Sequence, residues 1–63
     1  MIDLLIVTPT LNAEKYLINC INSTFNLRKK GAKHIIIDSG SKDSTLEIAK
    51  EFGIEVLYCP PGN

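Results

Sequence analysis

The sequence is poor in the residues on which several classes of protein depend. Among its 63 residues it has no Trp, one His and two Cys, and Cys20 and Cys59 stand far outside a metal-ligand spacing such as C-x-x-C. Lys plus Arg and Asp plus Glu both number 7, so the formal net charge is +0 and the basic excess typical of nucleic-acid binding is missing. We therefore expect no nucleic-acid partner, reduced cysteines and a cytoplasmic setting.

Long apolar runs are also missing. No run approaches the ~20 residues that a membrane-spanning helix needs. The N-terminal run, residues 4–7, is too short for the apolar core of a signal peptide and has no basic segment before it. We expect no membrane span in this segment, and a place at the cytoplasmic face of a membrane only for a longer form of the protein.

Glycine-rich phosphate-binding loops are the third absence. The dinucleotide-binding loop G-x-G-x-x-G would follow the first strand, but residues 8–13 contain no glycine. No Gly-Lys-Ser/Thr sequence forms a Walker A loop either. ATP-driven motors are therefore disfavoured, and a dinucleotide-binding module stays open only as a weaker alternative.

The patterning that is present predicts three strands and two helices in the order β-α-β-α-β. The expected strands are residues 4–7, 35–37 and 54–59, and the expected helices run from Asn12 to near Asn26 and from Ser44 to Gly53. Asn12 is expected as an N-cap, and Asp43 or Ser44, the latter with Glu47, as the cap of the second helix. Continuous apolar strands of this kind are typical of a parallel sheet.

One face of the expected sheet has no helix to cover it. Crossovers between parallel strands are nearly always right-handed, so both helices should lie on the same face. Leaving the other face in water is unfavourable by roughly 25 cal/mol per Å² of apolar area. We therefore expect residues 1–63 to be the truncated N-terminal part of a single larger α/β domain, or a chain that associates with itself through the uncovered face.

Polar residues follow the expected strands, where ligands of parallel sheets bind. The segments at these ends are residues 8–12, 38–41 and 60–63. Asp38 is the only carboxylate placed directly at a strand end. Because a carboxylate repels phosphate but accepts hydrogen bonds from a base N–H or a ribose hydroxyl, we expect Asp38 to face the nucleoside end of a nucleotide.

Two segments resemble motifs of the family 2 glycosyltransferases, enzymes with the GT-A fold. Residues 6–17 read IVTPTLNAEKYL, close to the family's opening V-x-P-T-[YLF]-N-x-x-x-x-L, and residues 36–45 read IIDSGSKDST, close to its [VI]-D-[DGS]-G-S-x-D-x-T segment. The resemblance implies that the chain is the parallel-sheet half of a Rossmann-like GT-A domain that binds a nucleotide-sugar. The complete enzyme would transfer a sugar to an acceptor hydroxyl.

The resemblance also implies which residues bind the nucleotide. Pro9, Thr10 and Leu11 would edge the base pocket, and Leu11 stands where many members have a Tyr that stacks on the base. Asp38 matches the first acidic residue of the family's D-D-G-S and would contact the base or the ribose. Ser39 adjoins it in the place of the second acidic residue.

The donor implied by the resemblance is a UDP-, dTDP- or GDP-sugar. The complete family enzyme would also need a divalent metal, Mn or Mg, held by a later Asp-x-Asp, and a still later acid as catalytic base. Neither motif occurs in these 63 residues. We therefore expect no catalytic or metal-binding residue and no transferase activity from this chain alone, and a non-catalytic remnant or partner-dependent α/β binding piece remains the alternative.

The other notable side chains are interpreted as structural. His34 precedes a strand with no second ligand or nucleophile near it in sequence. Tyr16 and Phe25 fit helix packing, and Cys20 falls on the apolar face of the first expected helix.

Overall fold

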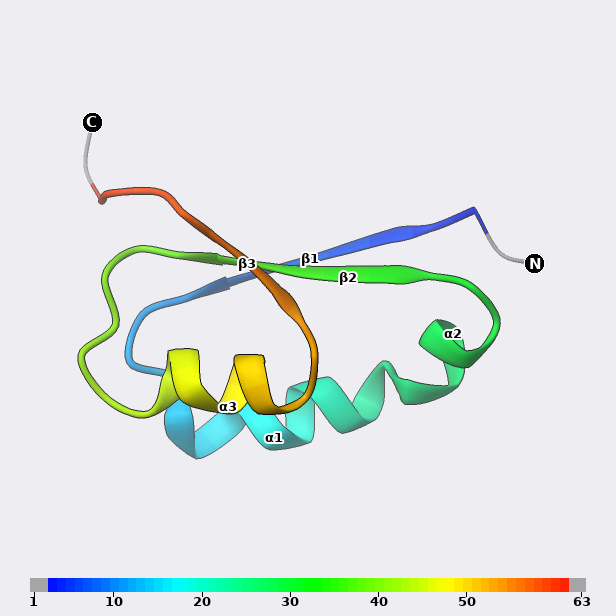
Figure 1. Ribbon diagram of the computed structural model, residues 1–63, viewed down its shortest axis with the longest axis horizontal. Helices are drawn as coiled ribbons and strands as arrows, with labels where there is room; N and C mark the ends of the chain where they lie inside the picture. Colours follow the sequence, from blue (N-terminus) through cyan, green and yellow to red (C-terminus); the bar gives the residue numbers. More distant parts are fainter. Residues whose placement is uncertain (1–2, 62–63) are drawn as a thin grey trace.

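The computed structural model describes residues 3–61 and is an α/β fold with a three-stranded parallel sheet (Figure 1). The elements in chain order are β1 (Leu5–Thr10), α1 (Glu14–Ser23), α2 (Phe25–Lys29), β2 (Lys33–Asp38), α3 (Thr45–Glu51) and β3 (Glu55–Tyr58). The strands lie in the order β1-β2-β3, and both pairs are parallel. The β-α-β-α-β fold expected from the sequence is confirmed, with the first crossover divided into two helices.

All three helices lie on one side of the sheet, as the handedness of the crossovers predicts (Figure 1). Burial alternates along the central strand β2 because successive side chains point to opposite faces. His34, Ile36 and Asp38 face the helices and are buried, whereas Ile35 and Ile37 face the other way and are half-buried. Among residues 3–61, no helix is both long and apolar enough to cross a bilayer.

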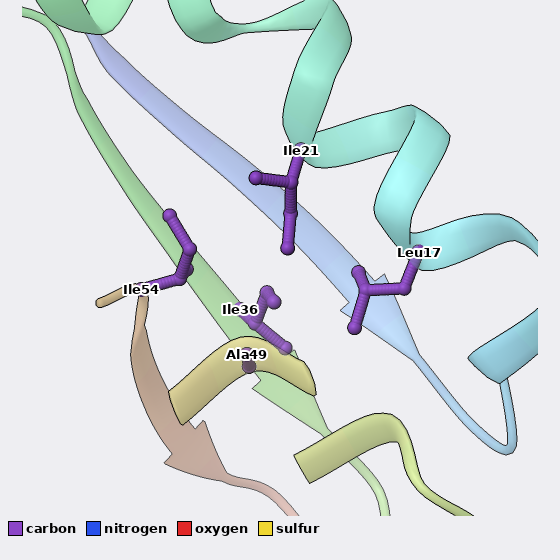
Figure 2. Close-up of a cluster of buried hydrophobic side chains, with 5 residues drawn as sticks. All are labelled: Leu17, Ile21, Ile36, Ala49 and Ile54. Carbon is purple, nitrogen blue, oxygen red and sulfur yellow. The ribbon is translucent and has the colours of Figure 1, made fainter. Parts of the chain in front are cut away.

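The hydrophobic core lies between the helices and the central strand. Five buried side chains form it: Leu17, Ile21, Ile36, Ala49 and Ile54. Figure 2 shows the side chains of α1 pointing toward Ile36 on β2, with the residues from α3 and the start of β3 on the other flank. A core of this size is small, so the buried polar groups beside it also matter for stability.

The face of the sheet opposite the helices is apolar and exposed; we call it the bare face. Leu5 is 55% exposed, Val7 47% and Leu57 47%, and all three point away from the helices. The side chains of Ile35 and Ile37 lie between them on β2 and are half-buried. No helix among the described residues covers this face, which confirms the expectation of a one-sided sheet.

The prediction that Asn12 caps the first helix is wrong. Ala13 occupies the N-cap position, and Asn12 lies one residue earlier with a left-handed backbone φ of 51°. Asn tolerates this conformation better than most residues because its short polar side chain can hydrogen-bond locally. The side chain of Asn12 binds another loop instead, as described below.

The first helical segment ends differently from the prediction. It is interrupted at Thr24, whose hydroxyl donates to the carbonyl of Ile21 at 2.9 Å, and then continues as α2 beyond the expected end near Asn26. Tyr16 and Phe25 do not pack in the core, because their exposed fractions are 72% and 52%. The α3 N-cap is Ser44, as expected, but its side chain makes no capping hydrogen bond.

His34 is buried and has a structural role. Its Nε2 lies 2.8 Å from Oγ1 of Thr8 on β1, and its Nδ1 lies 3.1 Å from Oγ1 of Thr24 between α1 and α2. Because the Thr24 hydroxyl proton already goes to the carbonyl of Ile21, Nδ1 must carry the donated proton and Nε2 must accept from Thr8. The neutral imidazole therefore joins both strands to the helical crossover.

Acid should weaken this fold through His34. Burial lowers the pKa of His34 below 6.5, and the nearby positive charge of Arg28 lowers it further. The unfolded chain then binds the proton more readily, so stability is full above pH 6.5 and falls as the pH decreases through that value. Urea unfolding at about pH 7.5 and about pH 5 should show a lower midpoint in acid.

The His34→Gln variant is the matched control, because Gln can donate and accept in place of the ring but does not titrate. Its midpoint should change less between the two pH values than that of the parent chain. Equal changes in the two proteins would show that His34 does not cause the acid sensitivity.

Candidate functional site at the carboxyl edge of the sheet

The carboxyl ends of the three strands lie side by side. The register pairs Thr10 with Asp38 and Asp38 with Tyr58, the last residues of β1, β2 and β3. Two backbone bonds extend the pairing past the strands, from Ser39 N–H to the Thr10 carbonyl (3.1 Å) and from Cys59 N–H to the Asp38 carbonyl (2.8 Å). The predicted ligand edge is thus one continuous surface.

Asp38 lies beneath this edge and is 1% exposed. Its Oδ1 accepts hydrogen bonds from Oγ1 of Thr10 (2.7 Å) and from Oγ of Ser41 (2.5 Å). Its Oδ2 accepts from the backbone N–H groups of Gly40 (2.9 Å) and Ser41 (2.7 Å). A carboxylate offers about four lone-pair positions, and these four donors use them.

The surroundings of Asp38 keep it ionised. Burial raises the pKa of Asp38, but the hydrogen bonds from Ser41, Thr10 and Gly40 outweigh it and lower the pKa to about 2. The negative charge therefore holds the turn that follows β2 and ties it to β1. Whether the carboxylate also contacts a ligand directly stays a prediction.

A two-way pair of hydrogen bonds joins the loop after β1 to the loop after β2. The N–H of Asn12 donates to Oγ of Ser41 (2.8 Å), and Oδ1 of Asn12 accepts from the N–H of Lys42 (2.7 Å). Since the Ser41 hydroxyl donates onward to Asp38, the Asn12 amide reaches the buried carboxylate through a single side chain. Sequence patterning did not reveal this contact, because the partners lie about thirty residues apart.

The starts of α1 and α3 cap each other. The N–H of Glu14 donates to Oδ2 of Asp43 (3.2 Å), and Oε1 of Glu14 accepts from the N–H of Ser44 (2.8 Å). The N–H of Ala13 donates to Oγ1 of the buried Thr45 (2.8 Å). These bonds satisfy N–H groups that a helix start leaves without intrahelical partners, and they fix the two loops relative to each other.

The five sequence-predicted site residues differ in their access to a ligand. Thr10 and Asp38 are buried and in direct contact, whereas Leu11 is 57% exposed and Pro9 is exposed. Ser39 is half-buried beside them. Of the five, Pro9, Leu11 and Ser39 are therefore the residues that solvent reaches.

One exposed aromatic residue at this edge was not singled out from the sequence. Tyr58, 67% exposed, ends β3, and its ring lies 3.8 Å from the position that a Cβ on Gly40 would take. The sequence pattern of this short strand does not indicate that Tyr58 lies beside Gly40 in the loop after β2.

The carboxyl edge does not resemble a metal centre. The described residues contain no group of three or more His, Cys, Asp and Glu side chains able to hold a metal ion. The nearest acids, Asp38 and Asp43, already accept hydrogen bonds from their own loops. The divalent metal that the resemblance implies therefore does not fit the donor set of residues 3–61.

A separate hollow lies at the other end of β3. Its volume is about 470 Å³, and its lining comes from α3 and the start of β3: Leu46, Lys50, Gly53, Ile54, Glu55 and Val56. None of the predicted nucleotide-binding residues lines it. This hollow is therefore separate from the candidate site.

Comparison with known sequences shows which proteins the chain is similar to. Residues 5–62 match the family described as Glycosyl transferase family 2. An uncharacterized protein of Methanocaldococcus jannaschii is 40% identical over 55 residues, which cover 86% of this chain and 21% of that protein. No solved structure matches the chain significantly.

Two further relatives have names that state an activity. A protein of Methanococcus voltae named dolichyl N-acetyl-alpha-D-glucosaminyl phosphate 3-beta-D-2,3-diacetamido-2,3-dideoxy-beta-D-glucuronosyltransferase is 40% identical over 48 residues, covering 73% of this chain and 15% of that protein. Glycosyltransferase GlyA of Streptococcus pneumoniae serotype 4 is 34% identical over 47 residues, covering 75% of this chain and 7% of that protein. The chain thus spans about a fifth or less of the length of these relatives.

Replacing Asp38 should destabilise the fold. In Asp38→Asn the amide NH₂ would face hydrogen-bond donors, and the negative charge would be lost whose hydrogen bonds lower the pKa from 3.8 to about 2. That shift corresponds to roughly 2 kcal/mol of stability, present above pH 3.8 and lost as the pH falls toward about 2. Urea unfolding near neutral pH should show a loss of this size.

The exposed Asp3 provides the control, because an isolated surface substitution such as Asp3→Asn should change stability by no more than about 0.5 kcal/mol. Equal unfolding midpoints for Asp38→Asn and the parent chain would contradict the structural role assigned to this carboxylate.

Proposed function

Because this chain belongs to glycosyl transferase family 2, we propose that residues 1–63 form the N-terminal part of one GT-A domain, whose carboxyl edge binds the nucleotide of a sugar donor. The complete enzyme would move the sugar from a UDP-, dTDP- or GDP-sugar to an acceptor hydroxyl. The family match over residues 5–62 supports the proposal, as do two relatives named as glycosyltransferases. A cytoplasmic location of the protein belongs to the same proposal.

The observation that carries the nucleotide site is the fixed geometry of the carboxyl edge. Parallel sheets bind ligands beyond the carboxyl ends of their strands. Here that edge has exposed apolar contacts at Pro9 and Leu11 and a polar residue, Ser39, beside them. The 2.7 Å hydrogen bond from Thr10 to Asp38 joins the two strand ends that carry these residues.

Different residues of this edge bind different parts of the nucleoside. Pro9 and Leu11 contact the flat face of the base, and Ser39 hydrogen-bonds to its edge or to the ribose. All four acceptor positions of Asp38 are occupied by groups of Thr10, Gly40 and Ser41, so a ligand N–H or O–H reaches this carboxylate only by replacing one of those donors. Asp38 thus binds the base or ribose in exchange for a local contact.

The remaining chemistry of sugar transfer needs groups that residues 3–61 do not supply. When bound in the complete enzyme, a divalent metal, Mn or Mg, would supply positive charge to the donor diphosphate. We assign its ligands and the catalytic base to other parts of the complete enzyme. The present residues bind and orient the nucleoside half of the donor.

Nucleotide binding can be tested on the 63-residue chain. Titration with UDP, GDP and dTDP should shift the backbone amide resonances of Thr10, Leu11 and Ser39 more than those at the opposite end of the sheet, such as Lys33. Ser39→Ala should weaken the response, whereas Ser23→Ala on α1 should leave it unchanged.

The outcome of the titration also separates the rival functions. A folded chain whose edge amides respond to none of the three nucleotides would contradict the proposed site. A stronger response to NAD than to UDP would favour the dinucleotide-binding alternative.

The bare face supports a second candidate function, in which the chain is a non-catalytic, partner-dependent α/β binding piece. In a complete GT-A domain the rest of the domain would cover this face. In the isolated 63-residue chain, only a second copy of the chain can cover the bare face. Pairing two bare faces would bury apolar side chains that are about half exposed, such as Val7 and Leu57.

Sedimentation should therefore show that the isolated chain self-associates. Val7→Lys places a charge on the bare face and should shift the chain toward the monomer. Ile18→Lys is the matched control, because Ile18 is 44% exposed, close to the 47% of Val7, but lies on α1 on the helical side. A parent chain that is a stable monomer at all concentrations would contradict this second candidate.

A further inference from the structure

A closed ring of hydrogen bonds surrounds the exposed tip of the loop after β1. From Thr10 the ring passes along the backbone to Asn12, whose N–H donates to Oγ of Ser41 (2.8 Å). The Ser41 hydroxyl donates to Oδ1 of Asp38, and the same oxygen accepts from Oγ1 of Thr10 (2.7 Å), which closes the ring. Leu11 stands between Thr10 and Asn12 and is 57% exposed.

Asn12 is the member of this ring that contributes least to the hydrophobic core. It is exposed to solvent, so its replacement removes no buried apolar surface. It nevertheless makes two bonds to the other loop, with its backbone N–H to Ser41 and with its Oδ1 to the N–H of Lys42 (2.7 Å). Its φ of 51° directs both groups of one residue toward that loop.

We propose that Asn12 is a positioning residue of the nucleotide site, an inference that rests on the proposed nucleotide function. Asn12 locks the loop after β1 against the loop after β2 and so fixes the spacing between Leu11 and Ser39. It acts through these neighbours and does not touch the nucleotide. Without this lock the tips of the two loops are held less firmly, although the bonds from Thr10 to Asp38 and between Glu14 and Asp43 remain. The nucleotide must then order the tips when it binds, which lowers affinity.

The role needs two properties of Asn12, its left-handed backbone conformation and its side-chain acceptor for Lys42. Substitutions separate them. Asn12→Gly keeps the left-handed backbone but removes the acceptor for Lys42. Asn12→Asp keeps an acceptor oxygen and a side chain that tolerates this conformation. Asn12→Ala loses both properties, and Asn19→Ala, at an exposed position on α1, is the matched control for an Asn substitution.

The experiment is a UDP titration of the parent chain and the four variants, followed by backbone amide shifts, with urea unfolding of each protein in parallel. Asn12→Ala and Asn12→Gly should bind UDP roughly three- to tenfold more weakly, the range expected for one or two lost hydrogen bonds. Asn12→Asp should restore most of the affinity, and Asn19→Ala should match the parent chain. A purely structural role would instead lower the unfolding midpoint without this pattern of rescue.

The failure of this inference differs from the failure of the proposed function. If the parent chain binds UDP and Asn12→Ala binds it equally well, Asn12 does not position the site, although the nucleotide function stands. If Asn12→Asp fails to recover affinity while its unfolding midpoint equals that of the parent chain, the acceptor role of Oδ1 is wrong. If the parent chain itself gives no response, the proposed function falls, and the inference falls with it.

Discussion

The buried negative charge of Asp38 is the constraint on which the carboxyl edge depends. An ionised carboxylate that is 1% exposed must have all of its lone pairs satisfied, and here only nearby backbone and hydroxyl groups are available. Satisfying them bends the chain tightly after β2 and draws Thr10 of β1 to within 2.7 Å. One buried charge therefore helps to fix the position of both loops, together with the bonds between Glu14 and Asp43 and between Ser44 and Glu14.

The one-sided sheet imposes a second constraint. Five side chains form the core, and much apolar surface stays exposed, including the bare face, where Leu5 is 55% exposed. With so small a core, the polar contacts on the covered face carry part of the stability. His34 shows this, because its ring joins Thr8 of β1 and Thr24 of the crossover, contacts that an apolar residue could not make.

The order of the elements could be predicted from sequence because periodicity is a local signal. The apolar run at residues 35–37 and the helix ending before Gly53 were found for this reason. The same local reasoning assigned Asn12 as an N-cap, and it failed because the partners of that side chain, Ser41 and Lys42, come from a distant loop. The family motifs placed Asp38 at the end of its strand, where the structure has it, but they could not show that Asp38 would be enclosed by its own turn.

The two motifs depend on each other for folding. Helices of ten residues, as in α1, or seven, as in α3, are too short to be stable alone, and their first N–H groups need partners. Glu14 and Asp43 supply those partners across the gap between the loops, so each motif completes the helix that belongs to the other. A substitution in one motif must therefore disturb the loop of the other. The loops at this edge, which carry the exposed Leu11, are held in place by the same bonds that allow both helices to begin.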